Sequence, residues 1–240
     1  MDQDVKKYKV MHRVFITVII STYLLIIVTF FTPLSSDIKL SIAILLVFLL
    51  LVFSILMRPK LFVLSIAYHF KKIKEQPNMI VKTNHNLATA DWTHVIEKKG
   101  FKHYKTFVEY ALYYRINLDP DDLLKRKGIL EVVVIIKDDT IDYHDDRISA
   151  LVNEIEEVLY QKNETYFHYA VFNLKSFDAI TDDVMETADQ VIYEKHKNHH
   201  VVVINGAFNE SHYELYFLHN DAYAPTLLYA STVQTIKDII

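Results

Sequence analysis

The 240-residue sequence contains no cysteine and only three glycines, and both shortages exclude familiar kinds of site. Without cysteine the chain cannot form a disulfide, a Cys-type zinc site or a thiol nucleophile. Gly100, Gly128 and Gly206 lie too far apart to form either glycine-rich phosphate-binding motif, G-x-G-x-x-G or G-x-x-x-x-G-K-[ST]. Because no other cofactor motif occurs, we expect no cofactor.

Charged side chains are absent from two stretches, residues 14–31 and 40–57. At about 1.5 Å per residue, a helix of either length is roughly 27 Å long, close to the hydrocarbon thickness of a bilayer. Between them, TPLSSDIK (residues 32–39) contains residues that break helices and turn the chain. The pattern predicts a transmembrane hairpin. Since neither span contains Asp, Glu, Lys, Arg or His, we do not expect an ion or proton pathway through the hairpin alone.

Lysine and arginine are concentrated in residues 1–13, before the first span, and in residues 58–75, after the second, whereas the tip offers only Lys39. Short cytoplasmic flanks accumulate these residues, so both termini are predicted to be cytoplasmic. A cleaved signal peptide is the alternative for the first span, but the apolar run is long and a second span follows at once. Lysine outnumbers arginine 21 to 5, a bias typical of AT-rich bacterial genomes, which predicts a multi-pass protein of the bacterial inner membrane.

The sign of the charge changes after the membrane region. Residues 1–74 carry 10 Lys or Arg and 3 Asp or Glu, whereas residues 75–240 carry 16 and 27. The basic part suits a lipid bilayer with anionic headgroups. The acidic part offers no broad electrostatic surface for nucleic acid, so no nucleic-acid partner is expected.

The apolar run LFVLSIAYHF in residues 58–75 is too short to cross a membrane, so we expect an interfacial stem there, either an interfacial helix or a packed segment. Pro59 allows the second span to end or kink before it. Residues 76–240 have the length of one domain. Their periodicity predicts a βαββαβ order, typical of a ferredoxin-like α+β sandwich. The expected elements are strands 79–84, 104–116, 129–137 and 166–175, helices 90–99 and 146–161, and a short inserted helix at 119–128.

An αβββα extension is predicted to follow. It comprises a helix at 181–197, strands at 201–208, 212–219 and 226–230, and a C-terminal helix that begins with a capping-box pattern at Ser231.

The sequence DDTIDYHDD, running from Asp138 to Asp146, is the densest group of potential ligands. Asp142, His144 and Asp145 are candidate catalytic residues, because carboxylates and imidazole could hold a divalent metal that activates water. An EF-hand is excluded, since Tyr143 and Ser149 occupy the positions of its Gly and Glu. The alternative is a solvated turn whose acids cap the next helix.

Two further sets of residues are weaker candidates. His196, His199 and His200 could chelate zinc if two of them shared a helix face, or could simply complement the dipole at a helix C-terminus. Glu131 and Lys137 bound the most apolar strand and have the residue types of a metal nuclease, but their spacing matches no catalytic motif.

The function favoured by these patterns is that of a membrane-anchored accessory or regulatory protein whose cytoplasmic domain binds a partner, and not an enzyme. That partner could be another protein, or a second copy meeting the first through the hairpin or the tyrosine-rich strand, residues 104–116. The same strand could instead be half-buried. A membrane-tethered metal-dependent hydrolase or nuclease using residues 138–146 is the alternative function.

Overall fold

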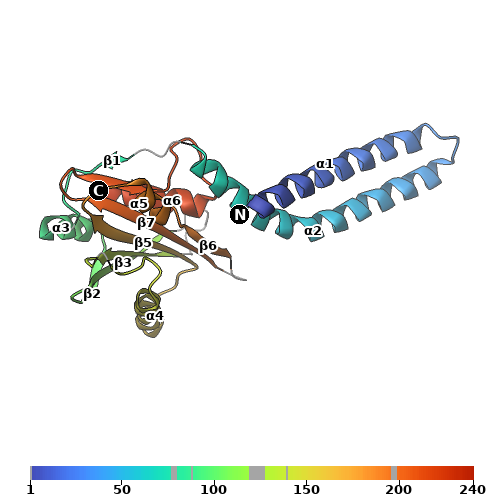
Figure 1. The fold of residues 1–240 in the computed structure, drawn as a ribbon. Helices are drawn as coiled ribbons and strands as arrows, with labels where there is room; N and C mark the ends of the chain where they lie inside the picture. Colours follow the sequence, from blue (N-terminus) through green and yellow to red (C-terminus); the bar gives the residue numbers. More distant parts are fainter. Residues whose placement is uncertain (1, 77–79, 88, 119–127, 139, 196–198) are drawn as a thin grey trace. The chain divides into compact units, whose positions relative to one another are not determined.

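The structure is a computed structural model that describes residues 2–76, 80–87, 89–118, 128–138, 140–195 and 199–240 (Figure 1). It is α+β, with two long apolar N-terminal helices and a mixed sheet. The chain divides into two compact units, Met1–Lys72 and Ile73–Ile240.

The first unit is a helical hairpin. Helix α1 (Asp2–Phe30) and helix α2 (Ser36–Lys74) are each long and apolar enough to cross a membrane. At the tip, Asp37 lies in the first turn of α2, where its negative charge interacts favourably with the helix dipole. The ammonium of Lys39 donates a hydrogen bond to the carbonyl of Phe30. The predicted break between the spans therefore forms a short turn.

The second helix continues beyond the predicted span and includes the segment expected to form the interfacial stem. Pro59 lies inside α2, which extends to Lys74. Proline removes one helical hydrogen bond, so local sequence favours a break there. However, α1 packs along this part of α2, with the rings of Tyr8 and Tyr68 stacked 5.0 Å apart. Packing of this kind supplies most of the stability of a helix and outweighs a single unfavourable residue.

The second unit contains an eight-stranded sheet with the order β1-β8-β7-β5-β4-β3-β2, and β6 also pairs with β7. Strands β4, β5 and β7 are parallel neighbours, and the other pairs are antiparallel. The strands are β1 (Val81–Lys82), β2 (Lys102–Thr106), β3 (Tyr110–Leu118), β4 (Gly128–Ile136), β5 (His168–Phe177), β6 (Ile192–Lys195), β7 (His200–Asn209) and β8 (Glu214–Phe217). The helices are α3 (Ala90–Lys98), α4 (Asp146–Gln161), α5 (Asp182–Ala188) and α6 (Leu227–Ile239).

The ferredoxin-like topology is not confirmed. A split βαβ arrangement would insert the first strand between the third and fourth, but β4 and β5 pair directly and β1 pairs with β8. The order of elements along the chain does not determine which strand edges meet. The expected strand 104–116 is also wrong, because it folds as the β2–β3 hairpin, closed by a hydrogen bond from Phe107 N to Tyr110 O of 2.7 Å.

The C-terminal extension differs from its prediction in two places. The expected helix 181–197 ends as α5 at Ala188, and the chain then forms β6 against β7. The expected strand 226–230 is wrong, because α6 begins at Leu227 after Thr226, whose hydroxyl accepts a hydrogen bond from Tyr229 N. After Ala188, strand pairing with β7 outweighs the helical pattern. The C-terminal helix begins earlier than predicted because Thr226 caps it, five residues before the predicted cap at Ser231. The short helix expected at 119–128 falls almost wholly outside the described residues.

Helices cover both faces of the sheet. On one face, α4 packs on β4 through a core that includes Val132, Val134, Ile148 and Ile155, and α5 packs near Ala207 at the far end of β7. On the other face, α6 lies against β5 and β7. Helix α3 joins this second layer through its fully buried tryptophan, whose Nε1 donates to the carbonyl of Ile239.

Candidate functional site

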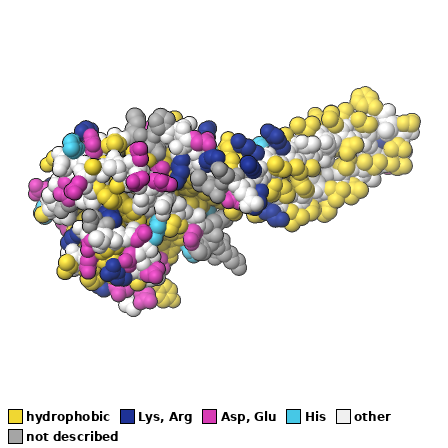
Figure 2. All heavy atoms as spheres, viewed as in Figure 1, with side chains coloured by type: hydrophobic (Ala, Val, Ile, Leu, Met, Phe, Trp, Pro, Cys, Tyr) yellow, Lys and Arg dark blue, Asp and Glu magenta, His cyan; other side chains and the backbone are white. Residues whose placement is uncertain are grey.

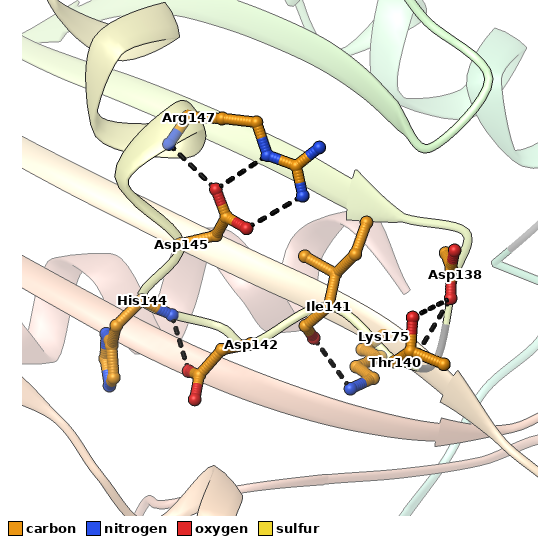
Figure 3. Close-up of polar contacts among 8 residues, drawn as sticks. All are labelled: Asp138, Thr140, Ile141, Asp142, His144, Asp145, Arg147 and Lys175. Carbon is orange, nitrogen blue, oxygen red and sulfur yellow. Dashed lines mark hydrogen bonds and ion pairs between the residues drawn. The ribbon is translucent and has the colours of Figure 1, made fainter.

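The loop that connects β4 to α4 carries the predicted acidic cluster, and three of its carboxylates, those of Asp138, Asp142 and Asp145, accept hydrogen bonds from the local backbone (Figure 3). Asp138 accepts hydrogen bonds from the backbone N and hydroxyl of Thr140 at 2.9 and 2.7 Å. Asp142 accepts from His144 N at 2.8 Å. In Figure 3 these two carboxylates face separate partners and do not converge on a shared point.

Asp145 is the N-cap of α4. Its carboxylate accepts from the backbone N of Arg147 at 2.8 Å and pairs with the guanidinium Nη2 at 2.9 Å. These contacts hold the pKa of Asp145 below its ordinary value. Among the described residues, no three His, Asp or Glu side chains lie close enough together to hold a metal ion. Asp139 lies outside the described residues.

Lys175, near the end of β5, attaches this loop to the sheet. Its side chain is buried and its ammonium donates to the carbonyl of Ile141 at 2.8 Å. The same ammonium lies 5.6 Å from the ring centre of Tyr143 and 5.2 Å from that of Phe177. The conformation of the loop therefore depends on Lys175, which lies 34 positions after Ile141 in the chain.

A triple substitution separates the structural and metal-binding roles of this loop. We expect Asp142→Asn, His144→Gln and Asp145→Asn together to lower the melting temperature by only about 2–4 °C, as the loss of a cap and of turn contacts does in a domain of this size. Neither the native chain nor the variant should gain thermal stability with Mg²⁺, Mn²⁺ or Zn²⁺. A metal-dependent rise of several degrees that disappears in the variant would instead establish a cation site, because a ligand stabilises the folded state it binds.

The two described histidines of the cluster, His199 and His200, do not lie on a helix. His196 falls outside the described residues, His199 immediately precedes β7 and His200 is its first residue. The His199 ring lies 5.3 Å from that of Tyr169, whereas His200 Nδ1 lies 2.5 Å from the hydroxyl of Tyr193. Successive residues of an extended chain point to opposite faces, so His199 and His200 are directed away from each other.

Glu131 and Lys137 do not meet. Glu131 is buried under α6, where its carboxylate is bound by Arg115, Asn117 and Thr235. Lys137 follows the other end of β4, roughly 20 Å away at 3.3 Å per residue, and donates to the carbonyl of Phe107. The two residues therefore do not form one site.

The tyrosine-rich segment is mostly interior. Tyr110, Tyr113 and Tyr114 are buried in β3, which is hydrogen-bonded on both edges by β2 and β4. Tyr104 alone lies on an edge strand, β2. Most of these tyrosines therefore lie inside the sheet, as the alternative of a half-buried strand predicts, and are not on an exposed docking edge.

One pocket brings the two predicted clusters together. It has a volume of about 550 Å³ and lies between α4 and β6, over β5 and the beginning of β7. We call it the α4–β6 pocket. His144 from the acidic loop and His199 from the histidine cluster both line it. Sequence reasoning identified these two residues separately but did not predict that they share a cavity.

Sequence analysis did not identify several polar residues of the α4–β6 pocket, among them Glu156 on α4, Tyr169 and Asn173 on β5, and Glu194 on β6. Asn173 could have been identified from sequence, because it is an amide in an otherwise apolar part of a strand. Its Nδ2 donates to the carbonyl of Tyr143 and to Asn205 Oδ1, both at 3.1 Å. Its Oδ1 is buried and accepts no hydrogen bond from the described residues. Burial raises the pKa of Glu156, and a hydrogen bond from Tyr169 opposes that shift.

Comparison of the chain with models of protein families found no match, and comparison with curated proteins found none either.

Proposed function

We propose that this chain is a membrane-anchored accessory or regulatory protein of the bacterial inner membrane, with both termini in the cytoplasm and an α+β domain that binds a partner. The observation that carries the proposal is the surface of the hairpin. In both helices, the most apolar 18-residue window has no buried residues. An apolar surface this long is unfavourable in water and is typical of helices surrounded by lipid.

The side chains at the N-terminal end of the hairpin support the proposed orientation. Figure 2 shows apolar side chains covering most of the hairpin, with Lys and Arg gathered near its N-terminal end. The rings of Tyr8, His12, Tyr68 and His69 lie close together at the same end. Cations at one end of a span are typical of the cytoplasmic side, whereas aromatic rings are typical of either membrane interface.

The α4–β6 pocket supports the binding role of the domain. Its volume falls within the range of small-molecule sites, about 300–1,000 Å³. Apolar strand residues and a few polar side chains line it together, which is the usual composition of such sites. A ligand bound there would contact α4, β5, β6 and β7 at once, so its binding would stabilise the folded domain.

Topology reporters test the membrane part of the proposal. A tag inserted after Ser35, in the turn of the hairpin, should be labelled by a membrane-impermeant reagent in intact cells from which the outer membrane has been removed. A tag after Ile240 should be labelled only once the inner membrane is opened, because the cations flanking the spans favour the cytoplasm. Labelling of both tags from the same side, or recovery of the chain from the soluble fraction, would contradict the proposed topology.

A further inference from the structure

The α4–β6 pocket occupies a part of the sheet face that the helices leave uncovered. Helix α4 packs over β4, and α5 packs near the far ends of β7 and β8. The strand residues between them, Tyr169, Val171 and Asn173 on β5 with Val201 and Val203 on β7, line the pocket. Because neighbouring strands are in register, these side chains project from the same face and form one continuous floor.

The floor is apolar at its centre. Val171 pairs with Val203, and Tyr169 pairs with Val201 in the next position of the same face. Ile192 on β6 and Val152 on α4 extend this surface to the two walls. An apolar body of modest size would therefore be removed from water on three sides, which is favourable by roughly 25 cal/mol for each Å² buried.

Two acidic side chains are among the described residues that line the pocket. Glu156 on α4 and Glu194 on β6 contribute carboxylates from opposite walls, and no Lys or Arg is found among the described residues that line the pocket. Glu156 is half-buried, and its raised pKa shows that the surroundings disfavour its negative charge. A carboxylate in this position interacts favourably with an added positive charge, since the low-dielectric surroundings strengthen the attraction.

The polar groups of the pocket also offer acceptors. Asn173 lies on the floor with a buried side-chain oxygen that receives no hydrogen bond from the described residues. The carboxylate of Glu156 accepts a hydrogen bond from Tyr169 and has capacity for more, because an ionised carboxylate has about four acceptor positions.

We propose that the α4–β6 pocket binds a small organic cation, a protonated amine attached to an apolar body. The ammonium group lies beside Glu156 and the apolar body lies on the valine floor formed by β5 and β7. This inference rests on the proposed binding function and specifies its ligand class. An anionic ligand of the same shape is disfavoured, because it would bring a second negative charge beside the half-buried carboxylate of Glu156.

Three probes with one apolar body and different charges test the proposal: 4-phenylbutylamine, 4-phenylbutan-1-ol and 4-phenylbutyrate. Binding to the full chain in uncharged detergent micelles is measured by titration calorimetry, with empty micelles as the reference for partitioning. We expect the amine to bind about tenfold more tightly than the alcohol, as one charge-assisted contact provides, and the carboxylate to bind most weakly.

Substitutions assign that binding to the pocket. Glu156→Gln should reduce the affinity for the amine to about that for the alcohol, whereas Glu157→Gln, next to it on α4 and outside the pocket lining, should have no effect. Ser149→Trp, an exposed position at the rim, should block all three probes without disturbing the core. Melting curves verify that each variant is folded.

The possible failures are distinguishable. If the three probes bind alike and Ser149→Trp blocks them, or if Glu156→Gln leaves the affinity for the amine unchanged, the pocket binds ligands but the cation inference is wrong. If no probe binds the native chain beyond the Ser149→Trp level, the inference and the use of this pocket are both wrong. The topology experiment decides the membrane part of the proposed function separately.

Discussion

Residues 73–240, expressed without the hairpin, should be soluble and should unfold cooperatively, whereas the full chain should require detergent. The second unit begins at Ile73, whose side chain is completely buried. The side chain of Gln76 accepts a hydrogen bond from Asn220, which attaches the beginning of the unit to the segment before α6. This unit contains the whole sheet and its own hydrophobic core, as an independently folding domain requires.

The position of the first residue provides a matched control. A fragment that begins at Gln76, the boundary predicted from sequence, lacks Ile73 and should be less stable than residues 73–240 by about 2–5 kcal/mol, the usual cost of removing a buried aliphatic side chain. Urea unfolding can be followed by the fluorescence of Trp92, the only tryptophan. Equal stability of the two fragments would contradict the structural boundary, and an insoluble 73–240 fragment would show that the domain depends on the hairpin.

Glu131→Ala should destabilise the domain by about 3–5 kcal/mol, because it removes the buried member of an ion pair and leaves the half-buried Arg115 without that partner. Arg115 Nε lies 2.5 Å from Glu131 Oε2, and Thr235 donates to the other oxygen at 2.7 Å. The guanidinium of Arg115 also donates to the carbonyl of Lys99 and lies 4.5 Å from the ring centre of Phe101. A single carboxylate thus links β3, β4 and α6.

The double variant Arg115→Met with Glu131→Leu distinguishes an unpaired charge from a simple packing defect. It should recover part of the lost stability, since replacing both ions by apolar groups is far less costly than removing one. Glu214→Ala is the control, because Glu214 pairs with Lys82 near the surface, and we expect little change there. If Glu131→Ala behaves like Glu214→Ala in urea unfolding, or the double variant is as unstable as Glu131→Ala, the buried pair does not carry the stability assigned to it.

The regular elements with strong local patterns were predictable. The expected helix 146–161 coincides with α4, and the expected strand 129–137 is displaced by one residue from β4. In α4 the apolar residues repeat at the helical period, whereas β4 is an almost continuous apolar run, which is typical of a central strand. Both signals are local to their segments. Helix α3 was also predicted, with Gly100 after it at φ +90°, a conformation that favours glycine.

The errors occurred where distant contacts oppose local patterns. Residues 192–195 continue a helical pattern but pair with β7 as β6. The candidate site shows the same limit. His144 and His199 were each identified by residue type, but their common pocket depends on the parallel pairing of β5 with β7 and on α4. No local feature of either segment specifies that pairing.

The sequence by itself determined the two apolar spans, the distribution of cations around them, the absence of cysteine chemistry and the α+β class of the domain, since each depends on composition or on spacing within one segment. Only the tertiary structure decided that the carboxylates of Asp138, Asp142 and Asp145 serve turns and a helix cap, and that Glu156 and Asn173 line a pocket. The physical reason is that a side chain's role depends on which partners surround it, and strand pairing brings together partners that are far apart in the chain.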